Sequence, residues 1–478
     1  MKYIIGVDGG SQSTKVVIYD LAGKVVSEGR KELQPMSLPK PGLVEHPDDD
    51  LWESLVDASQ EAMNRFPGEK EDIIGLGLCT IRFVRCLLKE DGTLSAPAMS
   101  WMDERVSKPY EHTNHDTAYV TTSSGYITHR LTGEFKDSSG NYQGLWPINT
   151  DTWDWSEDDE VFKKYNIPRH MLFDLQNPGT VLGCVTKEAA EATGIPGDIP
   201  VIATANDKAV EALGAGMLSD QSGLISLGTY IAGMVHGHEN PRDTTHFFPN
   251  FAAVPHEYLY ESNGIRRGMW TVSWFKELLG EELTKQAEAL KVSPEEFLNN
   301  EAAETVPAGS DGLITVLDWL STADEPFKKG MMIGFDGRHS RAHMYHSILE
   351  GIALTMKTNF DAMCEELDIK LDNIVITGGG SNGDLIMQIF ANVFGIEAKR
   401  NSVNGSASLG AAINTAVALE VYNTYGEAVD QMVEVSDTFT PEKDKHDFYT
   451  RFSKEVYQQV TAHTDGLLKK AHAFFNEQ

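Results

Sequence analysis

Cysteine is scarce in this 478-residue chain, which contains only Cys79, Cys86, Cys184 and Cys364. These residues are scattered and form no Cys-x-x-Cys pair, so the sequence predicts neither a disulfide framework nor a cysteine zinc site. No apolar run approaches the roughly 20 residues of a membrane-spanning helix. The N-terminus lacks the basic segment and apolar core of a signal peptide. We therefore expect a cytoplasmic protein that does not bind membranes.

Positive charge is also in short supply. The chain has 40 Lys and Arg residues against 71 Asp and Glu residues, which gives a formal net charge of −31. Such a surface repels DNA, RNA and anionic lipid, and no basic stripe offsets it. No nucleic-acid partner is therefore expected. An anionic ligand such as ATP would need a locally positive site or a divalent cation.

The most informative stretch present is residues 3–20, where two short runs rich in Ile and Val flank a polar turn. This pattern predicts a β-hairpin with Asp8 at the end of its first strand. The turn offers unhindered backbone N–H groups, hydroxyls and a cation, from Gly9, Gly10, Ser11, Ser13, Thr14 and Lys15. A carboxylate for a metal beside donors for phosphate oxygens indicates a nucleotide-phosphate site. An ordinary Gly-Ser hairpin is the alternative interpretation.

This opening pattern recurs near the middle of the chain. Residues 200–205 predict a strand with Asp207 just beyond its end, and residues 223–237 predict a second hairpin that turns at Gly228 and Thr229. Two acid-tipped strands and two phosphate-type hairpins suggest a duplicated unit. Prolines interrupt the pattern near residues 238–255, so we expect one domain over 1–245 and another over 246–478.

Further elements follow from periodicity and turn residues. We expect strands over 24–28, 73–78 and 85–89, helices over 48–63 and 187–193, and an irregular polar segment over 113–144. Residues 373–377 predict a strand that leads through Gly378, Gly379, Gly380 and Ser381 into a helix over about 382–394. A strand, a glycine loop and a helix N-terminus typically hold a nucleotide, although packing alone could require the glycines. Residues 404–420, rich in small side chains, predict a tightly packed helix.

Several motifs in one order resemble the FGGY family of carbohydrate kinases. They are Asp8 to Lys15, Trp101 to Arg105, Asn206-Asp207 with Gly214 to Gly216, Leu227 to Thr229, Gly268 to Phe275, 330–350 and Gly378 to Ser381. The likeness covers nearly the whole chain. It implies an α/β fold of two actin-like, ribonuclease H-like domains, with ATP and a small sugar or polyol in the cleft between them.

The resemblance also implies roles for single residues. Asp207 would be the catalytic base, and Asp8 would bind Mg²⁺ directly or through water. Phosphates would lie between the first turn (Gly10, Ser11, Ser13, Thr14, Lys15) and the second (Gly228, Thr229), and adenosine against Gly379, Gly380 and Ser381. Arg82, Trp101 and Asp103 would face or support the sugar.

Each of these roles has a structural alternative. Asp207 could cap the helix that follows it, Asp103 could pair internally with Arg105, and Trp101 could belong to the core. His339, His343 and His346 have metal-like spacing, but no carboxylate or cysteine accompanies them, and we expect a structural role.

The sequence departs from the family on the substrate side. Ile81-Arg82-Phe83 stands where xylulokinase-like members carry Gln-Met-His and glycerol kinase-like members carry Arg-Glu, and the region after Arg105 is shortened. We therefore expect glycerol and D-xylulose to be poor substrates and a different ketose or polyol of four to six carbons to be preferred.

Two other functions share the expected fold. An actin- or chaperone-like ATPase would not need residues 101–105 or an Asn-Asp pair before Gly-x-Gly, and residues 425–478 are too short for a peptide-binding domain. A non-catalytic sugar-sensing relative should have lost Asp8 or Asp207, and both are present. A homodimer is expected by analogy with relatives alone.

Overall fold

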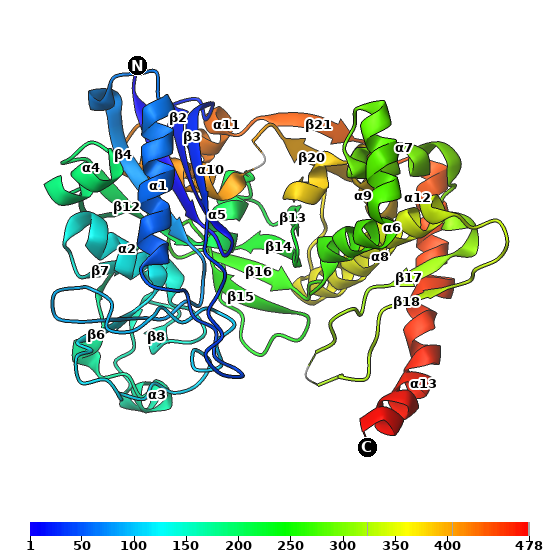
Figure 1. Ribbon diagram of the computed structural model, residues 1–478, viewed down its shortest axis with the longest axis horizontal. Coiled ribbons are helices and arrows are strands. Elements are labelled where there is room, and N and C mark those ends of the chain that lie inside the picture. Colours follow the sequence, from blue (N-terminus) through cyan, green and yellow to red (C-terminus); the bar gives the residue numbers. More distant parts are fainter. Residues whose placement is uncertain (323, 404, 477–478) are drawn as a thin grey trace.

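The computed structural model describes residues 1–322, 324–403 and 405–476, and these form two sheets covered by helices (Figure 1). The first sheet has the strand order β11 (Val181–Cys184), β12 (Pro200–Asn206), β4 (Ile73–Thr80), β1 (Tyr3–Gly9), β2 (Ser13–Asp20), β3 (Val25–Glu32). The second has the order β15 (Phe247–Phe251), β16 (Tyr258–Ser262), β14 (Ile231–Gly237), β13 (Ser222–Leu227), β19 (Asn373–Thr377), β20 (Glu397–Asn401), β21 (Val435–Phe439).

The two sheets repeat one topology. In the first, β1 pairs antiparallel with β2, β2 antiparallel with β3, and β1 runs parallel to β4, which runs parallel to β12. In the second, β13, β14 and β16 are successive antiparallel neighbours, and β13, β19 and β20 are successive parallel neighbours. The expected duplication and the two-domain actin-like fold are therefore confirmed.

The hairpin over 223–237 is confirmed as β13 and β14, but it belongs to the second sheet. The sheets therefore change between Asn206, where β12 ends, and Ser222, where β13 begins. This change lies before the boundary expected near 238–255. Pro241 and Pro255 lie in the loops on either side of β15, and Pro249 lies within that strand at the edge of the sheet. Proline occurs in edge strands and loops within a domain, so it need not separate domains. We propose to divide the two domains between residues 207 and 222.

Helices cover both faces of the first sheet. Alternate residues of its strands point to opposite sides, so each strand contributes side chains to both layers. Ile5 and Val7 pack on the side of α1 (Asp50–Arg65), α2 (Ser123–Thr132) and α4 (Lys187–Thr193). Ile4 packs on the other side, against α5 (Asp207–Gly214), α10 (Ser406–Ala418) and α11 (Tyr425–Met432). Although α10 and α11 come late in the chain, they complete the first domain.

Helices α5 and α10 cross at closest approach through glycines. A Cβ atom on Gly214 would lie 1.8 Å from the Ser406 carbonyl oxygen, and one on Gly410 would lie 2.0 Å from the Val210 carbonyl oxygen. The helix expected over 404–420 is rich in small residues because larger side chains would prevent this close approach. Residue 404 itself lies outside the described residues. The crossing fixes α5 between the two sheets (Figure 1).

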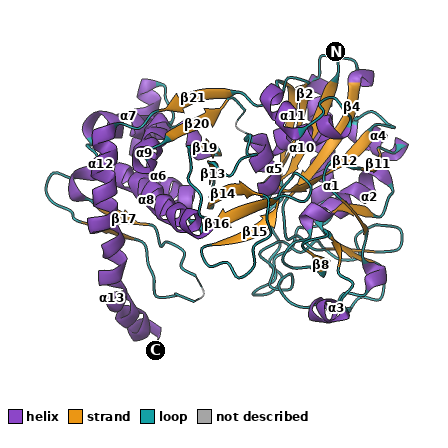
Figure 2. Ribbon diagram, turned by 180° about the vertical axis from the view of Figure 1, so that it is seen from behind, coloured by secondary structure: helices purple, strands orange, loops and turns teal. Residues whose placement is uncertain are grey.

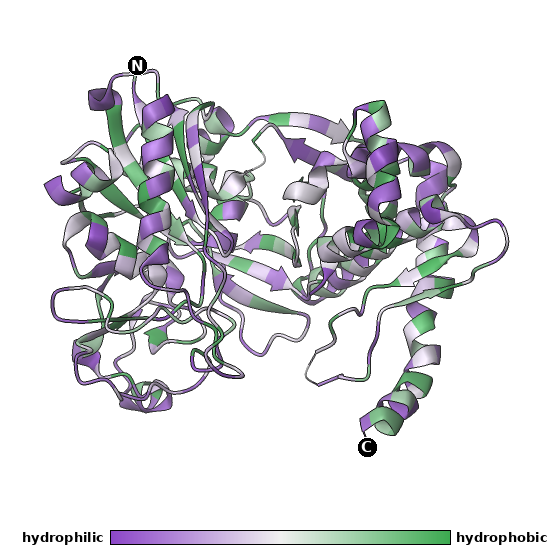
Figure 3. Ribbon diagram, viewed as in Figure 1, coloured by the Kyte–Doolittle hydropathy of each residue, from purple (hydrophilic) through white to green (hydrophobic). Residues whose placement is uncertain are grey.

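The second sheet packs against a group of long helices (Figure 2). They are α6 (Gly268–Leu290), α7 (Pro294–Thr305), α8 (Arg341–Leu367), α9 (Asp384–Phe394) and α12 (Lys443–Phe452), and α13 (Gln458–Asn476) then extends away from the body of the protein. Figure 3 shows hydrophobic residues on many strands of both sheets, whereas β20 and the outer loops are largely hydrophilic. Within the described ranges no helix is long and apolar enough to span a membrane.

Smaller elements lie beside the first sheet and on the far side of the second. They are β5 (Cys86–Leu88), β6 (Tyr119–Thr121), β7 (Lys136–Ser138), β8 (Ile148–Asn149), β9 (Asp154–Trp155), α3 (Asp159–Tyr165), β10 (Asp174–Gln176), β17 (Ile314–Val316) and β18 (Met331–Ile333). The expectation of an irregular segment over 113–144 was wrong, since it contains β6, α2 and β7. Helix α2 buries hydroxyl residues such as Ser123, Ser124 and Thr128, so it carries no clear apolar stripe.

Candidate active site

Three chemically important side chains follow parallel strands of the first sheet. Gly9 at the end of β1 is paired with Thr80 at the end of β4, and Thr80 is paired with Asn206 at the end of β12. Asp8, Arg82 and Asp207 lie within two residues of these ends. Because the carboxyl ends of parallel strands meet at one edge, the topology gathers all three there.

Asp207 is the first residue of α5, but it does not cap the helix. The side chain of Asn206 takes that role and accepts a hydrogen bond from the Ala209 amide at 3.2 Å. Burial raises the pKa of Asp207, the cations Arg82 and Lys208 oppose this, and Glu211 raises it further. The alternative reading of Asp207 as a helix cap is therefore removed, and its carboxylate sits in a charged cluster.

Asp8 belongs to the same cluster. Burial raises the pKa of Asp8 to about 7, the nearby carboxylates of Asp207 and Glu211 add to this, and Lys208 and Lys15 only partly offset it. Three carboxyl groups at the edge of a sheet repel one another unless a cation or a proton joins them. Oxygen ligands of this kind suit Mg²⁺, so the residues present fit the expected metal.

The next turn of α5 connects the first domain to the second sheet. Lys208 donates from Nζ to Glu211 at 2.8 Å and to the Ser226 hydroxyl of β13 at 3.0 Å. The Thr377 hydroxyl of β19 donates to Glu211 at 2.7 Å. These bonds hold the edge that carries Asp207 against the edge of the second sheet.

Arg82 is held by a residue that the sequence analysis missed. Its two terminal nitrogens donate to the two carboxylate oxygens of Glu261, at 2.8 and 2.9 Å. Glu261, the fourth of the five residues of β16, is 1% exposed. Burial lowers the pKa of Arg82, but Glu261 and then Asp207 raise it above its ordinary value. An acid within the otherwise apolar stretch Tyr258 to Glu261 was the available signal.

Several groups of the first phosphate turn make contacts within the first domain. The Gly10 amide donates to the Ser13 carbonyl at 3.1 Å and closes the turn. Thr14 is buried, and its hydroxyl bonds to Ser54 of α1 at 2.8 Å. Lys15 pairs with Glu28 at 2.9 Å. The Ser13 hydroxyl accepts a hydrogen bond from Arg30 Nε at 3.2 Å. Thr14 therefore holds the turn to α1, and Ser13 and Lys15 contact β3.

The second phosphate turn and the glycine loop lie together, because β13 and β19 are parallel and end side by side. A Cβ atom on Gly378, where φ is +83°, would lie 2.7 Å from the Leu227 carbonyl oxygen just before Gly228 and Thr229. The Ser381 hydroxyl donates to the Gly378 carbonyl at 2.8 Å. Gly228, Thr229, Gly379 and Gly380 are thus brought to one place, and Ser381 shapes the loop.

On the expected sugar side, Trp101 and Asp103 differ. Trp101 is half exposed and so is not a core residue. Asp103 is buried, accepts a hydrogen bond from the Val44 amide at 2.8 Å and pairs with Arg105 at 2.7 Å. Asp103 therefore forms the internal ion pair with Arg105 that the sequence left as an alternative.

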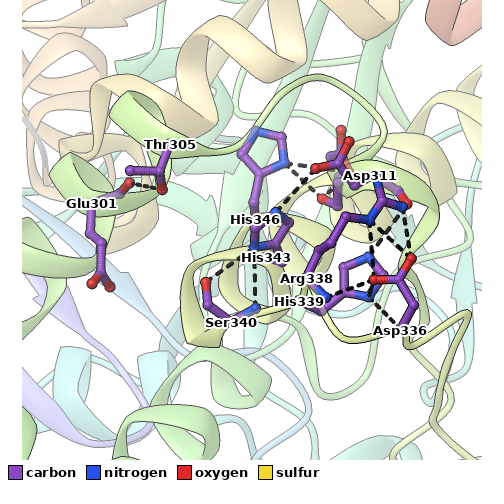
Figure 4. A network of polar contacts seen from close by, with 11 residues as sticks. Glu301, Thr305, Asp311, Asp336, Arg338, His339, Ser340, His343 and His346 are labelled. Atoms are coloured by element: carbon purple, nitrogen blue, oxygen red, sulfur yellow. Dashed lines mark hydrogen bonds and ion pairs between the residues drawn. The ribbon is translucent and has the colours of Figure 1, made fainter.

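The three histidines of residues 330–350 take part in a polar network of α8 and the loops before it (Figure 4). Carboxylates do accompany them, contrary to the sequence pattern, and the pairs are His339 with Asp336, His343 with Asp311, and His346 with Glu350. Glu350 also accepts hydrogen bonds from Ser310 and Tyr449, at 2.7 and 2.6 Å. These contacts agree with the structural role expected for this segment.

Comparison with known proteins gives one consistent result. Residues 3–119 and 110–214 match the FGGY family of carbohydrate kinases, N-terminal domain, and residues 223–419 match the C-terminal domain of that family. The chain is 56% identical over 471 residues, 98% of its length and 96% of the relative's, to the uncharacterized sugar kinase YgcE of Escherichia coli K12.

Solved structures show the same fold. The ligand-bound xylulose kinase of Lactobacillus acidophilus aligns with a TM-score of 0.84 at 20% identity, over 98% of this chain and 100% of that one. The glycerol kinase of Plasmodium falciparum with ADP aligns with a TM-score of 0.79 at 17% identity, over 96% and 99% of the two chains.

Proposed function

Because the chain belongs to the FGGY family of carbohydrate kinases, and is thus an ATP-dependent carbohydrate kinase, we propose that Asp207 is the base of its phosphoryl transfer. In this reaction a sugar hydroxyl attacks the γ-phosphorus of ATP, the bond to the β-phosphate oxygen breaks, and ADP leaves. The hydroxyl proton passes to the Asp207 carboxylate. The observation that carries this assignment is the capping of α5 by Asn206, which leaves Asp207 available at the strand edge.

Mg²⁺ fits beside Asp8, either through its carboxylate or through a bound water. When bound, the ion would neutralise charge on the β- and γ-phosphates. Asp207 and Glu211 raise the pKa of Asp8, and Glu211 raises that of Asp207. These carboxyl groups would supply the anionic surroundings that a divalent cation stabilises.

The two phosphate turns belong to different sheets. We assign the phosphates to the backbone of Ser11, in the turn that Gly10 closes, with Ser13 and Lys15 nearby, on one side and to Gly228 and Thr229 on the other. Gly379 and Gly380 would lie against the adenosine. Thr14 and Ser381, also expected among the ligand-binding residues, would support these turns through their hydrogen bonds to Ser54 and to the Gly378 carbonyl.

For the sugar site we propose that Arg82 donates to a hydroxyl or carbonyl oxygen of the substrate while Glu261 fixes its guanidinium plane. Trp101 offers an exposed ring as a further contact, and Asp103 acts through Arg105 as a positioning residue. The substrate would be a ketose or polyol of four to six carbons. A cytoplasmic homodimer is the assembly that fits this proposal by analogy with relatives.

An assay of ADP release with a panel of tetritols, pentitols, ketopentoses, ketohexoses and their acids tests this function. We expect sugar-dependent ADP release, with glycerol and D-xylulose low in the ranking by kcat/KM, and with Arg82→Ala lowering the rate of the preferred substrate. Steady ADP release that no sugar stimulates would instead indicate an actin- or chaperone-like ATPase. No turnover with any member of the panel would indicate a sugar-sensing relative. D-xylulose or glycerol in first place would contradict the reading of the sugar site.

A further inference from the structure

A second group of metal-type ligands lies outside the kinase site, at the end of the β14–β16 hairpin. His236 is in β14, His238 follows that strand, and Glu257 directly precedes β16. The ligand atoms of these three side chains all lie within 4.8 Å of one another. The cluster combines two imidazoles with a carboxylate, which is a ligand set that divalent transition metals prefer.

Strand register brings the three side chains together. His236 is paired with Leu259 and Gly237 with Tyr258, so one further step places His238 opposite Glu257. Side chains two residues apart point to the same face of a strand. His236, His238 and Glu257 therefore lie on the same face of the β14–β16 hairpin.

The backbone around Glu257 is also fixed. The Glu257 amide donates to the Val254 carbonyl at 3.2 Å, and the Ala252 amide donates to the Glu257 carbonyl at 3.0 Å. Of the three side chains, His236 is buried, Glu257 is partly exposed and His238 is exposed. An ion could thus enter past His238 and be held by the rigid, buried imidazole of His236.

The existing contacts are close to those of a metal site. His236 Nε2 lies 2.5 Å from Glu257 Oε2, and His238 Nδ1 lies 3.5 Å from Glu257 Oε1. Two ligands of a tetrahedral zinc, each about 2.0–2.1 Å from the ion, are about 3.3–3.5 Å apart. To bind an ion together with His236, Oε2 of Glu257 would move about 1 Å away from His236 Nε2, and its partly exposed side chain allows that rotation.

The cluster joins a partly exposed carboxylate to a buried imidazole. His236 also borders a small apolar cavity lined by Ala209, Ala212 and Leu213 of α5. Apolar surroundings around ligands exclude water and strengthen their interaction with an ion.

We propose that His236, His238 and Glu257 form a binding site for one divalent transition metal ion, with Zn²⁺ as the natural occupant, and that a water molecule completes its coordination. The ion would join the end of β14 to the start of β16. This clasp lies beside α5, the helix that begins with Asp207, but it is separate from the magnesium position at Asp8.

Equilibrium dialysis of the chelator-treated full chain against Zn²⁺, followed by metal analysis, tests the site. The wild type should retain one zinc ion that His238→Ala and Glu257→Gln each weaken by more than about tenfold. The exposed His246→Ala variant is the matched control and should bind as the wild type does. Both test positions are partly or fully exposed, so these variants should fold, which circular dichroism checks.

Cobalt substitution adds a signature that a plain His–Glu hydrogen bond cannot give. Co²⁺ bound by two imidazoles and a carboxylate should show visible d–d absorption in the wild type and in His246→Ala, and lose it in Glu257→Gln. The proposal is overturned if the wild type retains no zinc, or if His238→Ala and Glu257→Gln bind as tightly as it does. Because the experiment contains no nucleotide or sugar, either result leaves the kinase assignment unaffected.

Discussion

Replacing Arg82 by alanine should destabilise the protein far more than replacing Arg242, although both arginines make two-point ion pairs. Arg82 contacts Glu261 at 2.8 and 2.9 Å, and Arg242 contacts Asp151 at 2.8 and 2.9 Å. The pairs differ in burial. The side chains of Arg82 and Glu261 are 16% and 1% exposed, whereas those of Arg242 and Asp151 are 57% and 65% exposed.

The expected magnitudes follow from that difference. Arg82→Ala leaves the Glu261 carboxylate charged and unpaired in the interior, which costs about 3–5 kcal/mol of the free energy of unfolding. Arg242→Ala removes a solvent-exposed pair and should cost about 0–1 kcal/mol. The double variant Arg82→Leu with Glu261→Leu should recover most of the loss, because no buried charge then remains unpaired.

Urea unfolding without ligands, followed by tryptophan fluorescence and circular dichroism, measures these changes. The comparison uses the midpoint and the slope of each transition, so that a change in slope is not mistaken for a change in stability. A loss for Arg82→Ala within about 1 kcal/mol of that for Arg242→Ala would show that burial does not decide the cost of breaking the pair. It would mean that Glu261 takes up a proton or that water reaches the pair.

Three further results are expected. The pKa of Asp8 is raised from 3.8 to about 7, so the stability that its protonated form contributes is present below pH 4 and is lost as the pH rises through 7. Binding of Mg²⁺ must displace that proton. The Mg²⁺ concentration that gives half-maximal activity should therefore be about tenfold lower at pH 8 than at pH 6. Asp8→Asn should abolish phosphoryl transfer. If the Mg²⁺ requirement of the wild type changes with pH no more than Mg²⁺ binding to free ATP does, Asp8 is not the group that the metal displaces a proton from. Gly410→Ala, whose Cβ would meet the Val210 carbonyl, should lose about 1–3 kcal/mol of stability, whereas Gly466→Ala in open space on α13 should gain up to about 1 kcal/mol; equal effects would refute the close α5–α10 crossing. Small-angle scattering should give a smaller radius of gyration with an ATP analogue and the preferred sugar than without them, and an unchanged radius at saturation would argue against closure.

Local patterns predicted the parts of the site that depend on a single strand and its turn. Asp8 and Asp207 could be placed at strand ends because each follows a short Ile- and Val-rich or Ala-rich run. The duplicated hairpin at 223–237 was found in the same way. The sequence could not predict that this hairpin belongs to the second sheet, because the pairing of β13 with β19 joins residues about 150 positions apart.

Long-range contacts explain the remaining differences. Glu261 lies 179 positions from Arg82, and only the approach of β16 to the end of β4 makes it a partner. Helix α2 was missed because its buried face uses hydroxyl residues, which periodicity of apolar residues does not detect. The capping role of Asn206 needed the observed backbone, because both Asn206 and Asp207 are favoured caps.

Turnover of Asp207→Asn with the best substrate of the sugar panel tests directly whether Asp207 is the catalytic base. The variant keeps the shape of the side chain and the Asn206 cap but cannot accept the hydroxyl proton. We predict that ADP release falls by at least about a hundredfold, while ATP binding, measured by calorimetry, stays within a few-fold of the wild type. Near-normal turnover of Asp207→Asn would show that Asp207 does not accept the hydroxyl proton.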